Sequence, residues 1–252
     1  MDLGLKGKKV ILTGGSRGIG RAALEIFAQE GCDIAFISRN PEQVAETVKA
    51  LSKHGGKVYG EALDMTDHAA YVAWLNRAAE QLGGCDIFVP GASASGSGAT
   101  GDWDACLAAD VKGTVMGCDT LQPYLKKSDA AAIVIMASTA GTETFIVPQA
   151  FNAMKAALIA YSGQLSQAVG PMGIRVNCVS PGPIKFPGGN WEAIGKMMPE
   201  LYQATEANFA LGRWGGAEEV ARTIVFLASP ASSYTTGTNV VIDGGYTKRI
   251  QF

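Results

Sequence analysis

The chain has 252 residues, of which 47% are hydrophobic and 17% charged, with a formal net charge of −2. This composition supplies a sizeable core and excludes a disordered chain, and without a basic face we expect neither nucleic-acid nor membrane partners. The five cysteines are scattered, with no C-x-x-C pair, which indicates reduced core residues. Because the N-terminus lacks an apolar signal segment and no apolar run could span a bilayer, we expect a cytoplasmic location.

Short apolar runs alternate with longer helical patterns along the chain. Seven strands are predicted at 8–14, 32–38, 57–63, 86–91, 131–138, 174–180 and 239–243. Helices are predicted between them, at 19–30, 41–54, 102–126, 149–169 and 217–228. Continuous apolar strands are typical of a parallel sheet that is covered on both faces. We therefore expect one α/β domain over residues 1–252, a Rossmann-type doubly wound parallel sheet with helices on both faces.

A glycine-rich turn follows the first predicted strand. Residues 13–20 read TGGSRGIG and open the first helix. Gly14 allows a tight turn, while Gly18 and Gly20 let the backbone and the helix approach a bound pyrophosphate. The helix N-terminus offers free N–H groups and the positive end of the helix dipole. Placed between a strand and a helix, this turn predicts a dinucleotide-binding site.

The residues after the second predicted strand indicate which dinucleotide binds. An NAD-selective site usually carries an acidic residue here, which bonds to the ribose 2′-hydroxyl. This chain has Ser38 and Arg39 instead, and Arg17 of the glycine turn is expected nearby. Two guanidinium groups and a hydroxyl suit a 2′-phosphate. We therefore expect the cofactor to be NADP.

Six motifs follow one another in a specific order and spacing. They are TGGSRGIG (13–20), LDMTD (63–67), ASTAG (137–141), the lysine of FNAMK (151–155), SPGPI (180–184) and VIDGG (241–245). With these motifs the chain resembles the short-chain dehydrogenase/reductase family over essentially its whole length. The resemblance implies an NADP-dependent oxidoreductase that interconverts a ketone and a secondary alcohol, and a homotetramer with the DGG end in an interface.

The resemblance also implies which residues hold the cofactor. Asp64 and Met65 are expected to contact the adenine, Lys155 to bond to the nicotinamide ribose, and Ile184 to lie beside the carboxamide. The other expected cofactor-binding residues are Gly14, Ser16, Arg17, Gly18, Ile19, Gly20, Ser38, Arg39, Gly91, Pro181 and Gly182.

The catalytic positions depart from the family pattern. In that family a serine polarises the substrate oxygen, a tyrosine gives or takes the proton, a lysine lowers the pKa of the tyrosine, and an asparagine supports a water relay. Ser138 and Lys155 match the serine and the lysine. The tyrosine position, four residues before Lys155, is Phe151, and the asparagine position is Asp110. We take these four residues as the candidate catalytic positions.

Phe151 has no proton to give. Positions 151 and 155 share a helix face, so Lys155 is placed to tune a tyrosine but keeps only its ribose role here. Losing a general acid typically costs about 10²–10⁴-fold in rate, so we expect impaired ketone–alcohol interconversion with binding retained. Three explanations are open. One is a Tyr-to-Phe substitution made to trap a complex. Another is a member with other chemistry (a lyase, a cyclase, or a reduction with a proton from Asp110, water or substrate). The third is a non-catalytic NADP-binding protein.

The connection after the sixth predicted strand is long. Residues 185–215 are rich in Pro, Gly, Trp and Met, and long connections are commonly lids or binding loops. An apolar inner face of this lid is predicted from Phe186, Trp191, Met197, Met198, Tyr202 and Phe209. We therefore expect a small hydrophobic ketone or secondary alcohol as the substrate. No His, Cys and carboxylate cluster has metal-ligand spacing, so no metal is predicted.

Overall fold

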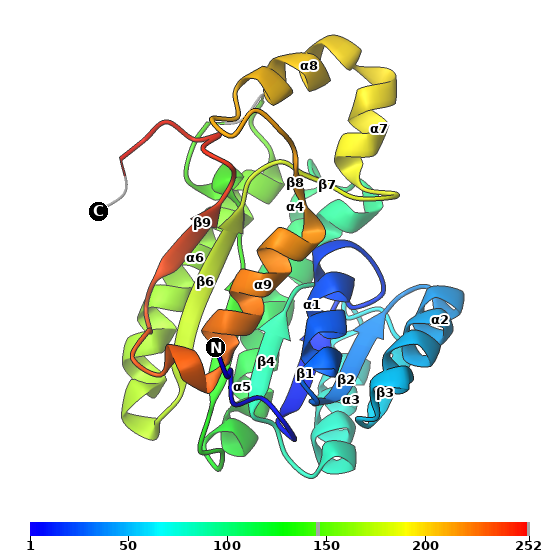
Figure 1. Cartoon of the computed structure of the whole chain (residues 1–252), viewed down its shortest axis with the longest axis vertical. Helices are drawn as coiled ribbons and strands as arrows, with labels where there is room; N and C mark the ends of the chain where they lie inside the picture. The colour runs from blue at the N-terminus through cyan, green and yellow to red at the C-terminus, as the bar shows by residue number, and fades with distance from the viewer. Residues whose placement is uncertain (145–146, 251–252) are drawn as a thin grey trace.

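The centre of the molecule is a seven-stranded parallel sheet with the order β3-β2-β1-β4-β5-β6-β9 (Figure 1). The computed structural model describes residues 1–144 and 147–250. The strands are β1 (Lys9–Thr13), β2 (Asp33–Ser38), β3 (Val58–Ala62), β4 (Ile87–Pro90), β5 (Ala132–Met136), β6 (Arg175–Pro181) and β9 (Asn239–Ile242). Every neighbouring pair in this sheet is parallel. The predicted fold class is confirmed.

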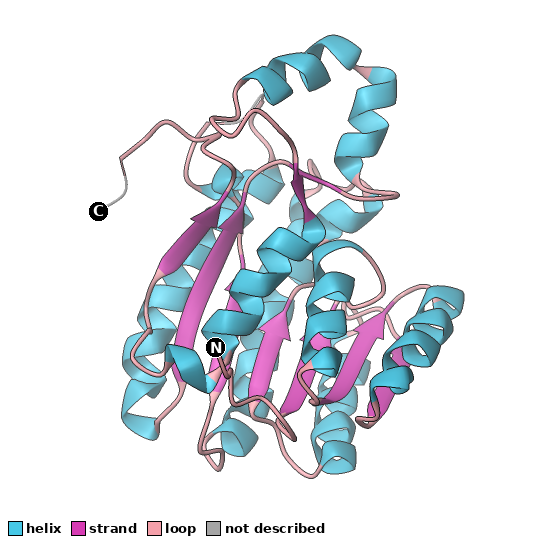
Figure 2. Ribbon diagram, in the orientation of Figure 1, coloured by secondary structure: helices cyan, strands magenta, loops and turns pink. Residues whose placement is uncertain are grey.

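Helices cover both faces of the sheet (Figures 1 and 2). One face carries α1 (Gly18–Gln29), α2 (Pro41–Leu51) and α9 (Ala217–Ala228), and the other carries α3 (His68–Leu82), α5 (Gly113–Leu125) and α6 (Ala150–Val169). The helix starts follow local sequence signals. The Asn40 side chain accepts a hydrogen bond from the N–H of Gln43, and Pro41 occupies the first turn of α2. These layers leave the carboxyl ends of the strands free for a site.

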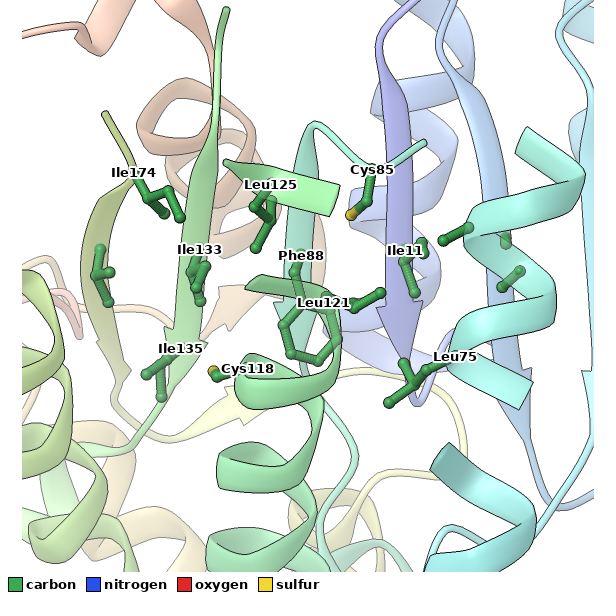
Figure 3. Packing of buried hydrophobic residues seen from close by; sticks show 14 of the residues in the cluster. Ile11, Leu75, Cys85, Phe88, Cys118, Leu121, Leu125, Ile133, Ile135 and Ile174 are labelled. Atoms are coloured by element: carbon green, nitrogen blue, oxygen red, sulfur yellow. The ribbon is translucent and has the colours of Figure 1, made fainter. Parts of the chain in front are cut away.

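The core lies in two layers because successive strand residues face opposite sides of the sheet. Ile11, Phe88 and Ile133 face α3 and α5, where Leu121 of α5 packs among them (Figure 3). The alternate strand residues, such as Val10 and Val134, pack against α1 and α9. Both layers are buried almost completely, which makes the sheet a rigid support for its loops.

Two segments differ from the predicted elements. The stretch 102–126, predicted as one helix, is divided into α4 (Trp103–Cys106), a π-helical turn (Leu107–Lys112) and α5. The long connection after β6 contains β7 (Ile184–Lys185), α7 (Asn190–Met197), α8 (Pro199–Ala207) and β8 (Gly215–Gly216). In Figure 1, α7 and α8 lie beyond the carboxyl ends of the strands. Hydrophobic periodicity does not reveal a π turn here, because the turn changes the helical repeat over only six residues, Leu107–Lys112.

All five cysteines are buried free thiols, as predicted. Burial raises the pKa of Cys32 to about 12 and that of Cys178 to about 11, which keeps these thiols protonated and unreactive. In the described part of the chain, no helix combines the length and the apolar character needed to cross a membrane.

Candidate active site

The predicted site residues gather where the chain order of the sheet reverses. β1 lies between β2 and β4, so the connections that leave these strands diverge at their carboxyl ends. Such a switch point in a parallel sheet opens a crevice for ligands. The glycine turn follows β1, Gly91 follows β4 and Ser138 follows β5, so all three come from adjacent strand ends.

The glycine turn forms a cradle that side chains would fill. Gly14 has φ +80°, and a Cβ placed on it would lie 2.9 Å from Cα of Ala92. A Cβ on Gly20 would collide with the carbonyl oxygen of Gly14. Arg17, the N-cap residue of α1, makes no side-chain capping bond. Its side chain therefore does not accept a hydrogen bond from the first N–H groups of α1. This cradle, with its uncapped helix N-terminus, fits a dinucleotide pyrophosphate.

The expected phosphate-binding residues after β2 are brought together in part. The hydroxyl oxygens of Ser16 and Ser38 lie 2.7 Å apart, and the Ser16 hydroxyl donates to the amide oxygen of Gln43 at 3.1 Å. Arg39 is exposed beside them, and its charge helps to lower the pKa of Asp64, after the larger effect of the Thr66 backbone N–H. Gln43 was not predicted, although the Asn40 cap that begins α2 is the sequence signal that places it here.

Arg17 does not join this group. Its guanidinium donates to the carbonyl oxygen of Gly188 at 3.2 Å and to that of Gly96. The side chain therefore connects the glycine turn to the loop after β4 and to the segment before α7. The expectation that Arg17 lies beside Ser38 and Arg39 is wrong for this arrangement, because backbone carbonyls across the crevice use its donors.

The remaining cofactor-side residues occupy several environments. Met65 is 5% exposed and its side chain packs against Gly113 in the core, so only its backbone is free to face an adenine. Gly91 donates its N–H to the carbonyl oxygen of Thr13 at 3.1 Å. The others lie in or beside the strand ends: Gly18 and Ile19 begin α1, Pro181 ends β6, Gly182 donates to the carbonyl oxygen of Ile242, and Ile184 is buried in β7.

Ser138 and Lys155 come together through a close packing of backbones. Ser138 is half-buried after β5, and its hydroxyl oxygen accepts the N–H of Ala140 at 3.2 Å. A Cβ on Gly141 would lie 2.6 Å from the backbone nitrogen of Ala156, next to Lys155 on α6. The Lys155 ammonium, 4% exposed, donates to the carbonyl oxygen of Met136 at 2.8 Å. Glycine in the ASTAG motif is thus what lets the serine turn rest on α6.

Phe151 lies one helical turn before Lys155, as the sequence predicted. Its ring packs with Ala94, Cys106 and Ala109, and its centroid lies 5.5 Å from the Lys155 Nζ. The contact is a cation–π interaction, which places the ring and the ammonium within each other's electrostatic reach. No proton of Phe151 is available to a substrate.

Asp110 contacts Lys155 directly. It lies in the π-helical turn and is 0% exposed. One carboxylate oxygen is 3.0 Å from the Lys155 Nζ, and the other accepts the backbone N–H of Ala94 at 3.0 Å. The sequence placed Asp110 at the relay position but did not indicate this ion pair, which depends on how the π turn meets α6.

The segment 185–215, which was predicted as a lid, carries an aromatic cluster. Trp214 contacts Trp191, Tyr202 and Phe209 at centroid distances of 5.1, 4.4 and 5.2 Å. Phe186 packs on the glycine turn, where a Cβ on Gly18 would lie 2.7 Å from its ring. Met197 and Met198 are 73% and 51% exposed, so their side chains are not part of this cluster. Trp214, which joins the cluster, was not among the predicted lid residues.

Comparison with known proteins places these features in a family. The family described as enoyl-(acyl carrier protein) reductase matches residues 14–247. Isoepoxydon dehydrogenase patN of Penicillium expansum is 37% identical over 257 residues, which cover 100% of this chain and 99% of that protein. Its counterpart from Aspergillus clavatus is 38% identical over 253 residues, covering 98% of each. The structure of L-sorbose reductase from Gluconobacter frateurii, complexed with NADPH and L-sorbose, matches with a TM-score of 0.89 and 28% identity, covering 99% of this chain and 100% of that chain.

Proposed function

This chain belongs to the short-chain dehydrogenase/reductase family of oxidoreductases, and we propose that it uses NADP(H) as its cofactor. The proposed reaction interconverts a small hydrophobic ketone and its secondary alcohol. Because of Phe151, its rate is expected to be lower than that of the same chain with a tyrosine at this position. The observation that carries this proposal is the close packing of the Ser138–Gly141 turn on the backbone of α6 at Lys155, together with the glycine turn after β1. The catalytic pattern departs from that of the family at two positions, Phe151 and Asp110, and the proton donor is the element that Phe151 removes.

The cofactor assignment follows from the residues around the cradle. We expect the uncapped N-terminus of α1, with Gly14, Gly18 and Gly20, to hold the pyrophosphate. Ser38 ends β2 and Arg39 follows it, with no carboxylate among residues 37–40, which favours a 2′-phosphate. The related L-sorbose reductase is a complex with NADPH, in agreement with this choice. A bound reduced nicotinamide supplies the hydride that a carbonyl carbon accepts.

The catalytic residues divide the remaining work. The Ser138 oxygen accepts the Ala140 N–H, which leaves its own O–H available to donate to a substrate oxygen. Lys155 would hold the nicotinamide ribose with an N–H that is not directed at the Met136 carbonyl. Phe151 supplies no proton, so the substrate oxygen would take its proton from solvent or from another donor.

The lid and the assembly complete the proposal. We propose that residues 185–215 close over the substrate within one 1–252 domain, with the aromatic cluster around Trp214 providing the apolar wall.

We also propose a homotetramer, because β9 is an edge strand of half-buried residues and the Asp243–Gly245 turn follows it. Sedimentation of the purified chain measures the assembly, and a monomer would contradict it.

The test measures cofactor choice and turnover in the same preparation. Calorimetric titration of NADPH and NADH should show tighter NADPH binding, and Arg39→Ala should weaken NADPH without affecting NADH. Arg222→Ala is the matched control, since this arginine pairs with Glu218 on α9. With a panel of aromatic and alicyclic ketones, slow NADPH consumption that Ser138→Ala abolishes supports the proposal. Tighter NADH binding refutes the cofactor assignment, and no ketone-dependent NADPH consumption refutes the reaction.

A further inference from the structure

The Lys155 ammonium has three neighbours that differ in charge. One N–H reaches the Met136 carbonyl at 2.8 Å, the Asp110 carboxylate lies 3.0 Å away, and the Phe151 ring lies 5.5 Å from Nζ. Lys155 and Asp110 are both buried, with side-chain exposures of 5% and 0%. Solvent therefore screens neither charge, and each acts mainly on the other.

A lysine lowers the pKa of a neighbouring phenol by its positive charge, because that charge stabilises the phenolate. Here the carboxylate of Asp110 lies closer to Nζ than the ring of Phe151 does. The two opposite charges form a dipole, and the field of a dipole falls off faster with distance than that of a single charge. At position 151, the stabilisation that an isolated ammonium would give is largely cancelled.

We propose that Asp110 is a positioning residue that compensates the charge of Lys155, so that Asp110 and Phe151 form a matched pair in a site built to work without a tyrosine. The proposal rests on the proposed function of Lys155 as a cofactor-ribose ligand. On this proposal, Phe151 is not the one change in an otherwise ordinary reductase site, because Asp110 departs from the family pattern with it. Restoring the phenol alone does not restore an efficient acid, because the lysine charge is already neutralised.

The other ionisable groups near the pair do not change this balance. Cys106 of α4 and Cys178 of β6 interact electrostatically with Lys155, and burial raises the pKa of both thiols. Both thiols are therefore neutral near pH 7. Among the described contacts of Lys155 and Asp110, the remaining polar partners are uncharged: the Met136 carbonyl, the Ala94 N–H and the Thr114 hydroxyl, which donates to the backbone carbonyl of Asp110.

The first experiment measures the introduced phenol directly and needs no substrate. The ultraviolet absorbance of tyrosinate is titrated in Phe151→Tyr, with the starting chain subtracted, and in Asp110→Asn/Phe151→Tyr, with Asp110→Asn subtracted. The proposal expects the single variant to titrate near the ordinary value of about 10. The double variant should titrate at least one unit lower, a tenfold change in the ionisation constant. A midpoint two units below the ordinary value in the single variant, or equal midpoints, overturns the proposal.

The second experiment measures the rate of NADPH consumption against pH with a ketone that the starting chain reduces. The double variant should exceed Phe151→Tyr at least tenfold, and its rate profile should shift in pH with the phenol midpoint. Asp110→Asn alone should give no gain, because it adds no acid. Equal rates for the single and double variants overturn the proposal.

The outcomes separate this proposal from the proposed function. If no variant reduces any ketone, the proposed reaction fails, while the phenol titration still decides whether Asp110 compensates Lys155. Thermal unfolding of Asp110→Asn checks that the variant is folded. If it is not, the midpoint of Phe151→Tyr alone decides, since a strongly lowered value is incompatible with a compensated lysine.

Discussion

The buried ion pair makes Asp110→Ala a test of the structure as well as of the site. Asp110 is 0% exposed, and its carboxylate receives both the Lys155 ammonium and the Ala94 N–H. Removing it leaves the ammonium of a side chain that is 5% exposed beside the Met136 carbonyl and the Phe151 ring, with no negative charge among its described contacts. Breaking one partner of a buried pair costs about 3–5 kcal/mol, because the remaining charge is buried without compensation. We expect Asp110→Ala to lower the free energy of unfolding by that amount in a urea titration followed by circular dichroism.

Two controls separate this effect from a general loss of packing. Asp110→Leu combined with Lys155→Met removes both charges and should be much less destabilising than Asp110→Ala, since paired apolar replacements are often close to neutral. Asp129 is the surface partner of Lys8, and its side chain is 86% exposed. Asp129→Ala should therefore leave the free energy of unfolding unchanged. If Asp110→Ala loses less than about 1 kcal/mol, Lys155 finds solvent or another partner, and the reasoning about charge compensation is wrong.

Two further predictions concern the elements that hold the lid and β9. The Arg213 guanidinium and the Gly216 N–H hold the pKa of Glu219 at about 2, below the usual 4.5. The contribution of the ionised Glu219 to the free energy of unfolding is therefore complete above pH 4.5 and is lost as the pH falls to about 2. The difference in stability between the starting chain and Glu219→Gln should therefore shrink over that acid range in urea unfolding, and a constant difference would contradict the cause given. Arg175 donates to four carbonyl oxygens, those of Leu227, Ala228 and Ser229 at the end of α9 and that of Thr235. A lysine cannot reach all four, so Arg175→Lys should cost about 2 kcal/mol of unfolding free energy. A loss below about 0.5 kcal/mol would refute this role.

The local features of this protein were predictable from its sequence. Continuous apolar runs between helical patterns indicate a parallel sheet, because strands buried on both faces have no polar side. The glycines of the first turn could be assigned because the conformation at Gly14 and the close approach at Gly20 depend on the absence of a Cβ. The positions of Ser138, Phe151 and Lys155 likewise followed from motif spacing along one strand end and one helix.

The tertiary structure decided what those residues contact. Arg17 crosses to Gly188 and Gly96 instead of joining Arg39, and the side chain of Met65 turns into the core. The Asp110–Lys155 ion pair forms only because the π-helical turn directs a carboxylate onto α6. Hydrophobic periodicity and the conformational freedom of glycine act within a few residues, so both can be recognised in the sequence. The direction of a long side chain and the pairing of two buried charges depend on which distant elements meet, and that is settled only when the whole chain packs.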